Sequence, residues 1–277
     1  MAGDRKKSKY VRRPAWRVRW HLIESVLLTE TFPDRDGYGG SRWDEWERRI
    51  KQGHKAEEKQ IERIYNERKK HPADNPLYDP DEWAGEDYHE TCRLTNSMYA
   101  ALVVSLWSEM EHFLRSVLSV CQIETGSRKK AEDEAKALCL GFSQGKTTAG
   151  YRRACIGALN RIEARDRTGF GVLKDQLFQE VRVACGQCKA FYGINAIRIL
   201  SNCYKHNDGH YRPQGDKDNE IRPSLLRRWG ILKERNEIDY SNLPIRELVT
   251  ACNVFCRDLL GKVESELEKR ATRRSSE

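Results

Sequence analysis

The sequence predicts an all-α protein, a bundle of four or five core helices with a charged helical N-terminal extension. Apolar residues recur every three or four positions through most of residues 96–267, which is the period of a helix with one buried face. Strand-like alternation is scarce, and 277 residues are enough for one large domain or two small ones. We therefore expect helices packed against helices around a common core.

The composition argues against a membrane or exported protein. Hydrophobic residues make up 38% of the chain and charged residues 33%, and no apolar run approaches the ~18 residues of a membrane-spanning helix. The charges at the N-terminus are not followed by the apolar stretch of a secretory signal. Nine cysteines without such a signal are typical of reduced, buried thiols. These features predict a cytoplasmic protein with no membrane contact.

Residues 1–20 form a basic segment, with eight Lys or Arg residues against one acidic residue. Aromatic residues are interleaved with these charges, which suits RNA because cations contact phosphates and rings stack on bases. A solvated tail, or a segment that docks on an acidic partner protein, would have the same composition. The residues that we expect to contact RNA are Arg12, Arg13, Trp16, Arg17 and Arg19.

The elements before residue 90 are predicted from local composition. A short apolar run at 22–28 indicates one helix, and glycine, proline and aspartate indicate a loop at 33–40. Residues 41–70 read as one long, highly charged helix, most simply a solvated one, although an arm that binds a protein partner has the same pattern.

Three prolines and many acids at 71–90 indicate a linker. The predicted organisation is therefore an N-terminal extension at 1–90, a bundle at 91–268 and a basic flexible tail at 269–277.

The bundle itself contains several predicted helices. The strongest covers 96–121, with Asn96 or Ser97 as its N-cap. Further helices are expected at 148–162, 172–183 and 190–206, a short basic element at 225–232, and a final helix that Ser241 or Asn242 would cap.

Two motifs are weak. GFSQGKTT at 141–148 has one residue too few between its glycines for a phosphate-binding loop, and no strand precedes it. Cys185 and Cys188 have CxxC spacing without the βα context of a redox site. A four-cysteine zinc site with Cys252 and Cys256 is the less common alternative to buried thiols. We therefore expect no cofactor and no metal.

Residues 190–211 are the most informative stretch. The helix predicted there ends at Asn207, Asp208 and Gly209, residues typical of a helix stop. Asn202 and His206 are four residues apart and so share one face. A histidine at a helix end is suited to proton transfer because its pKa lies close to neutrality, although a capping role is the simpler alternative.

The run SNCYKHNDG resembles the signature of the HEPN superfamily, which is an Arg, a polar residue and a His, with four to six residues between Arg and His. Asn202 matches the polar residue and His206 the His, whereas Ser201 occupies the Arg position. The nearest upstream arginine, Arg198, leaves seven intervening residues. The segment LVVSLWSEMEHFLRSVL also looks like the first helix of the HEPN bundle, with Glu109 or Glu111 as its mid-helix acid. The resemblance covers about residues 95–265.

This resemblance implies a metal-independent endoribonuclease, a toxin or antiviral-defence effector whose site forms when two copies pair as a homodimer. It assigns the general acid/base role to His206 and an orienting role to Asn202. Lys205 or Arg198 would then supply the cation that stabilises the phosphate charge. The alternatives are a catalytically degenerate relative that binds RNA or protein within a defence complex, and a scaffold subunit that uses the 41–70 helix as its arm.

Overall fold

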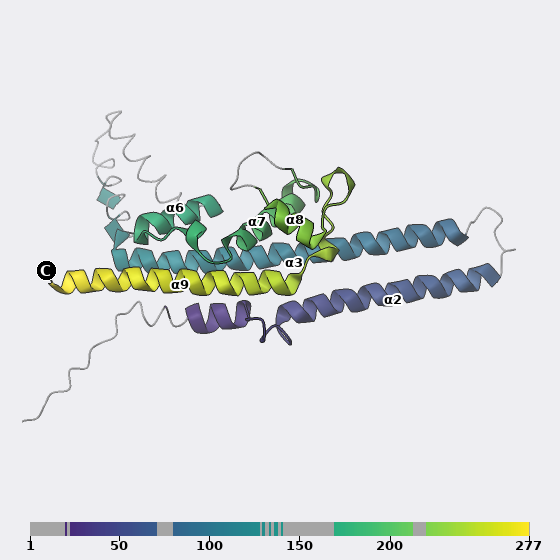
Figure 1. Cartoon of the computed structure of the whole chain (residues 1–277), viewed down its shortest axis with the longest axis horizontal. Coiled ribbons are helices and arrows are strands. Elements are labelled where there is room, and N and C mark those ends of the chain that lie inside the picture. Colours follow the sequence, from purple (N-terminus) through teal and green to yellow (C-terminus); the bar gives the residue numbers. More distant parts are fainter. Residues whose placement is uncertain are drawn as a thin grey trace, which may run out of the picture.

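The computed structural model describes residues 20, 23–70, 80–127, 129–130, 133, 136–137, 140, 169–212 and 220–276. This part of the chain is helical and contains no strand, and its only sheet-like pairings are two isolated bridges, His210 with Glu237 and Leu232 with Ile238. The predicted all-α class is therefore confirmed (Figure 1). None of the described helices combines the length and the apolar content that a membrane crossing requires.

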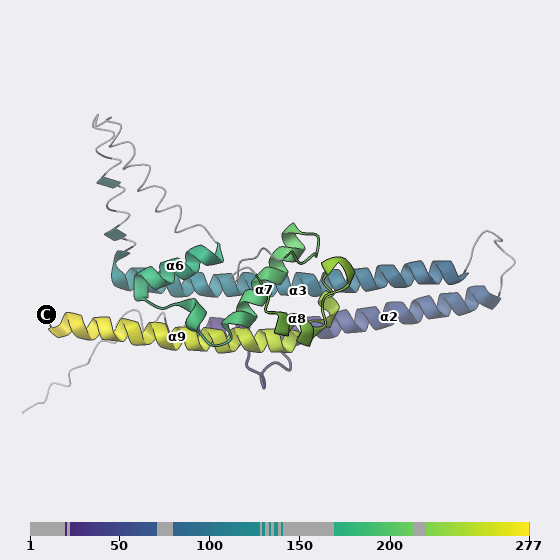
Figure 2. The same cartoon turned by 45° about the horizontal axis from the view of Figure 1, so that its top comes forward.

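The helix α3 (Pro80–Thr125) is the central element of the fold. Its 46 residues make it about 70 Å long. One half lies beside α9 (Ile245–Ser276), and α2 (Arg42–Lys70) runs antiparallel along the other half (Figures 1 and 2). The helices α6 (Phe170–Val181) and α7 (Phe191–His206) lie across α3 and α9 on one side.

The core lies where α3, α6, α7 and α9 meet. The predicted apolar stripes account for it, because residues at helical spacing on all four helices are buried against one another. The largest fully buried side chains are Trp43, Tyr240, Phe32, Phe113, Phe255, Leu102, Leu106, Met110, Leu114, Leu173, Leu177 and Ile194.

Short elements close the bundle. The predicted helix at 22–28 is a π-helix, η1 (Ile23–Thr31). Its end is held by hydrogen bonds, since the indole N–H of Trp43 donates to the carbonyl of Thr31 at 2.6 Å and the amide of Asn253 donates to that of Phe32 at 2.5 Å. The remaining short elements are η3 (Cys185–Gln187), α8 (Pro223–Trp229), η5 (Glu234–Asn236) and η6 (Tyr240–Asn242).

The expected linker at 71–90 is wrong from residue 80 onward, because α3 begins at Pro80. Proline is tolerated at the first position of a helix, and an acid such as Asp81 is favourable at the positive end of the helix dipole. The boundary expected at residue 90 therefore falls inside a continuous helix. Trp20 and Trp43, from the expected extension, are buried in the same core as the bundle helices.

The C-terminal tail also differs from the expectation. The helix α9 continues to Ser276, so residues 269–276 are helical. Local contacts support this last stretch: Lys269 pairs with Glu266 at 2.6 Å, and the hydroxyl of Thr272 donates to the carbonyl of Glu268 at 3.0 Å. The predicted caps of the final helix are wrong, because α9 begins at Ile245 and Ser241 and Asn242 belong to η6. The helices α2, α6, α7 and α8 lie close to their predicted ranges, whereas the helix expected at 148–162 and the GFSQGKTT motif lie outside the described residues.

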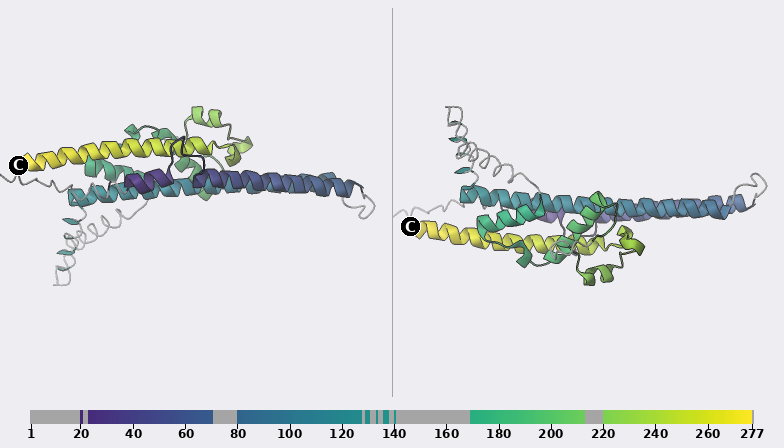
Figure 3. Two further views of the ribbon diagram at one scale, coloured as in Figure 1. Left: turned by 90° about the horizontal axis from the view of Figure 1, so that it is seen from below. Right: turned by 90° about the horizontal axis from the view of Figure 1, so that it is seen from above.

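Residues 53–70 of α2 and 80–98 of α3 form an antiparallel hairpin, here called the arm, which extends past the other helices (Figures 1 and 3). Polar and aromatic contacts join its two helices. The imidazole of His54 lies 2.9 Å from the hydroxyl of Thr95, and the hydroxyl of Tyr65 donates to Asp81 at 2.5 Å. The two helices of the arm bury few apolar side chains between them. The stability of the arm therefore depends on the polar and aromatic contacts that join α2 to α3.

Candidate functional site

The end of α7 forms as the sequence predicts. The backbone N–H groups of Asn207 and Gly209 both donate to the carbonyl of Cys203, at 3.0 and 3.1 Å. Gly209 has a φ of +78°, a left-handed conformation that glycine adopts without strain. The helix therefore stops directly after His206 and presents its last turn to solvent.

Asn202, Lys205 and His206 cluster on this last turn. Lys205 follows Asn202 by three positions and His206 follows it by four, so both are neighbours of Asn202 on the helix surface. Lys205 and His206 are exposed and Asn202 is half-buried. An amide, an ammonium group and an imidazole thus lie on the same helical turn.

Arg198 lies apart from this cluster. It is eight residues before His206, about 12 Å along the helix axis. Its guanidinium donates to the side-chain oxygen of Asn195 at 3.1 Å and lies 5.7 Å from the ring centroid of Phe170 in α6. These contacts hold Arg198 toward α6, so of these two cations Lys205 is the one that shares the last turn of α7 with His206.

Ser201, which occupies the position of the HEPN arginine, faces the core. Its side chain has no exposed surface, and its hydroxyl has no hydrogen-bond partner among the described residues. A guanidinium could not occupy this position without a large desolvation cost. The chain therefore differs from the HEPN signature in two ways. It has a serine in place of the arginine, and the helix turns this position toward the core.

A groove of about 790 Å³ runs between α3 and the end of α7. Lys205 reaches it, whereas Asn202 and His206 do not line it. Its charges are mixed, since Arg93 and Lys205 line it together with Asp208 and Glu237. The complete lining is Arg93, Asn96, Ser97, Ala101, Val104, Ser105, Tyr204, Lys205, Asp208, Gly209, Glu237, Ile238 and Tyr240.

Asn96 organises one wall of this groove, a role that differs from the predicted N-cap of its own helix. Its side-chain oxygen accepts hydrogen bonds from the backbone N–H groups of Tyr240 at 2.6 Å and Ser241 at 3.3 Å. Its amide nitrogen donates to the carbonyl of Ile238 at 3.3 Å. Asn96 does satisfy backbone groups, as an N-cap would, but those groups belong to η6 and to Ile238 just before it.

Tyr240, which the sequence analysis did not single out, fixes η6 to α7. Its hydroxyl donates to the carbonyl of Leu200 at 2.8 Å, and its ring makes an edge contact with Tyr204. Burial raises the pKa of Tyr240 far above its ordinary value, so the hydroxyl stays protonated as a donor.

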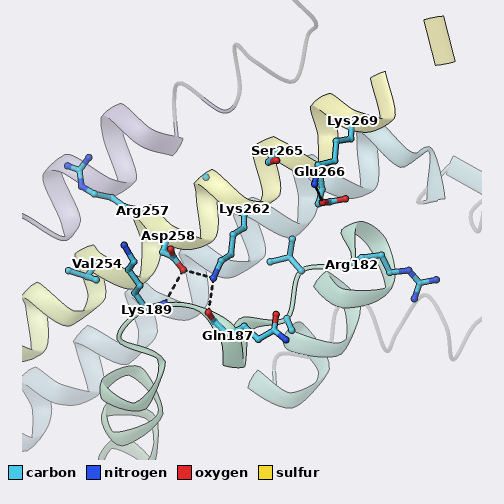
Figure 4. A pocket seen from close by; sticks show the side chains of 13 residues that line it. Arg182, Gln187, Lys189, Val254, Arg257, Asp258, Lys262, Ser265, Glu266 and Lys269 are labelled. Atoms are coloured by element: carbon cyan, nitrogen blue, oxygen red, sulfur yellow. Dashed lines mark hydrogen bonds and ion pairs between the residues drawn. The ribbon is translucent and has the colours of Figure 1, made fainter. Parts of the chain in front are cut away.

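A second groove, of about 710 Å³, lies between η3 and α9 (Figure 4). At its centre Lys262 donates to the carboxylate of Asp258 and to the carbonyl of Gln187, both at 2.7 Å, and the backbone N–H of Lys189 donates to Asp258 at 3.0 Å. Partial burial would raise the pKa of Asp258, but the hydrogen bonds from Lys262 and Lys189 outweigh it and hold the pKa below its ordinary value. This network fastens the start of α7 to α9.

Most of the described cysteines are buried free thiols. Burial raises the pKa of Cys185 to about 12 and that of Cys188 to about 11, whereas a reactive CxxC pair needs a lowered pKa. Among the described residues no group of three or more potential metal ligands occurs, so the four-cysteine zinc alternative has no support. The predicted RNA-contacting residues Arg12, Arg13, Trp16, Arg17 and Arg19 lie outside the described residues.

The described elements define an all-α bundle with a two-helix arm, and Lys205 and His206 are exposed at the end of α7. Comparisons with protein-family models, curated proteins and solved structures return no match. The class that the fold defines is thus an all-α helical bundle.

Proposed function

We propose that the protein is a HEPN-like, metal-independent endoribonuclease whose active site is the Asn202–Lys205–His206 cluster. The observation that carries the proposal is that Asn202 is the helical neighbour of both Lys205 and His206 at the solvent-exposed end of α7. An acid/base, a group that orients it and a cation are the three parts that phosphodiester cleavage without a metal requires.

In the proposed reaction His206 accepts the proton of a ribose 2′-hydroxyl. The 2′-oxygen attacks the adjacent phosphorus, the bond from phosphorus to the 5′-oxygen breaks, and a proton is delivered to that leaving oxygen. The products are a 2′,3′-cyclic phosphate and a 5′-hydroxyl end. Lys205 stabilises the negative charge that develops on the phosphoryl oxygens, and Asn202 orients the imidazole.

One histidine cannot remove the first proton and deliver the second in the same step. This requirement supports the paired site that the resemblance implies, in which His206 of a second copy serves the leaving oxygen. A homodimer through the bundle is thus part of the proposal. The groove beside Lys205 is the space in which the flanking nucleotides would lie.

The test is RNA cleavage in the presence of EDTA. Wild type is expected to produce cyclic-phosphate ends, and His206→Ala to lose this activity. His112→Ala removes an exposed histidine of α3 away from the cluster and serves as the matched control. Lys205→Gln should reduce cleavage strongly and Arg198→Gln only weakly, since Arg198 is held toward α6. Equal activity of wild type and His206→Ala would refute the assignment.

A second candidate is a degenerate module that binds RNA without cleaving it. It is favoured by the residue at the signature position, because Ser201 replaces the arginine there and is buried. RNA binding that weakens steeply with salt, together with no cleavage by wild type, would support this candidate. Lys205→Gln would then weaken binding, whereas His206→Ala would leave it nearly unchanged.

The biological role that we infer for the nuclease is that of a toxin or antiviral-defence effector acting on cellular RNA. Expression of wild type in a bacterial host should then arrest growth, and expression of His206→Ala should not. The two variants must reach equal protein levels for the comparison to hold. Growth arrest by both would argue that toxicity does not depend on the proposed site.

A further inference from the structure

The arm carries a groove of about 440 Å³ along the seam between its two helices. On the α2 side it is lined by Gly53, Glu57 and Ile61, and on the α3 side by Glu90, Leu94 and Met98, among others. From residue 87 to residue 98 it follows α3 for about three helical turns. The length suits a short helix rather than a small molecule.

The floor of this groove is apolar and open to solvent. Leu94 is 53% exposed and Met98 is 52% exposed, while Ile61, on the α2 side, is half-buried. Large apolar side chains that gather in one concave surface mark an interaction site, whereas single exposed ones do not. Methionine in particular adapts its shape to different partners.

Gly53 has no side chain, so a partner can approach the backbone of α2 closely at this point of the groove. It lies in the interior of α2, where glycine weakens a helix relative to alanine. A Cβ added at Gly53 would meet nothing within 4 Å. Packing within the chain therefore gives no reason for a glycine here, whereas close contact with a second helix does.

The rim of the groove is acidic. Glu57 stands on the α2 side and Asp87 and Glu90 on the α3 side. Arg93 pairs with Glu90 at 3.3 Å, and the imidazole of His54 lies 2.9 Å from the hydroxyl of Thr95 and 3.3 Å from the carboxylate of Glu58. A partner seated on the apolar floor would thus have carboxylates on both flanks.

We propose that the arm groove binds a lysine- or arginine-rich amphipathic helix of a partner protein. Its apolar face would lie on Ile61, Leu94 and Met98, and its basic residues would pair with Glu57, Asp87 and Glu90. The acidic rim argues against a second copy in the same groove, because two such grooves face to face would place like charges together. The proposal is independent of the nuclease assignment.

The experiment measures binding of fluorescent peptides to the full chain. The probes are an amphipathic helix of leucine and lysine, the same helix with glutamate in place of lysine, and a leucine–lysine peptide of scrambled order. Only the first probe should bind well, and salt should weaken it. The scrambled peptide should bind at least about tenfold more weakly, because it lacks a continuous apolar face.

Two variants connect binding to the groove. Gly53→Leu adds a side chain at a position where a Cβ meets nothing within 4 Å, and it should weaken binding about tenfold or more. Gly261→Leu, a matched change at an open glycine of α9, should not. Charge reversal at Glu57 and Glu90 to lysine should abolish binding. The control is a variant in which Glu30 and Glu264, outside the groove, are both replaced by lysine, which changes the net charge by the same amount.

Three results would overturn the proposal. Equal binding of the helical and scrambled peptides would indicate charge attraction alone. Binding that survives both Gly53→Leu and the reversal of Glu57 and Glu90 would place the peptide elsewhere. A wild type that sediments as a dimer, with Gly53→Leu as a monomer, would identify the occupant as a second copy. Circular dichroism of each variant excludes unfolding as the cause of lost binding.

Discussion

Gly193 of α7 and Ala251 of α9 lie at a close crossing of the two helices, where a Cβ added to Gly193 would come within 3.1 Å of the Cβ of Ala251. That distance is tighter than side chains normally accept, so the glycine sets how closely α7 approaches α9. The approach positions the whole of α7, including the polar cluster at its far end.

Gly193→Leu is therefore expected to lower the free energy of unfolding by at least about 1–3 kcal/mol, because it overpacks this crossing. Gly261→Ala, at an open position of α9, should instead raise it by about 0.5–1 kcal/mol. Urea unfolding followed by circular dichroism measures both. A Gly193→Leu protein as stable as wild type would show that the two helices can separate at no cost.

Asn96→Ala should destabilise the protein by about 1–3 kcal/mol, since it removes three hydrogen bonds and leaves the N–H of Tyr240 without its partner. Asn96→Asp keeps the accepting oxygen and should lose less. Amide hydrogen exchange at Tyr240 and Ser241 provides a local readout, and faster exchange there is expected in the alanine variant. Unchanged exchange would contradict the anchoring role.

The helical class, the extent of α2 and the end of α7 are predictable from the sequence, because each depends on local signals. The spacing of apolar residues indicates the helices, and Asn207 and Gly209 indicate where α7 stops. The start of α3 was misjudged because proline both interrupts helices and begins them. Local composition at residue 80 does not distinguish the two cases, whereas packing against α2 does.

The candidate site was predictable only in part. The spacing of Asn202, Lys205 and His206 follows from the helical repeat alone. The burial of Ser201 depends on how α7 packs against α3 and α9, and the contact of Arg198 with Phe170 depends on where α6 lies. No local pattern encodes either. The role of Asn96 likewise depends on residues more than one hundred positions away.

Restoring the signature at position 201 should fail. Ser201→Arg places a charge where no side-chain surface is exposed, so we expect a loss of about 3–5 kcal/mol in the free energy of unfolding. Ser201→Ala removes a buried hydroxyl without a described partner and should be neutral or stabilising by up to about 1 kcal/mol. Thermal unfolding of both variants decides the matter, and a Ser201→Arg protein that melts with wild type would show that residue 201 can reach solvent.

Asp258 should contribute to stability in a pH-dependent way. Its pKa is lower in the folded protein than its ordinary value, so its contribution is complete above about pH 4 and is lost as the pH falls through the folded pKa. Asp258→Asn should therefore reduce stability at neutral pH and flatten the acid side of the stability profile. Denaturant unfolding between neutral and acidic pH tests this, and parallel profiles for the two proteins would refute it.

The helix α3 passes without interruption from the arm into the body, and Asn96 lies at the junction. The arm part of α3 can be treated as a lever that pivots at Asn96, which lines the same groove as Lys205 of α7. From Asn96 to Pro80 the lever is about 24 Å long, so each degree of tilt displaces its tip by about 0.4 Å. A load placed on the α3 side of the arm is therefore transmitted past Asn96, the residue that anchors η6.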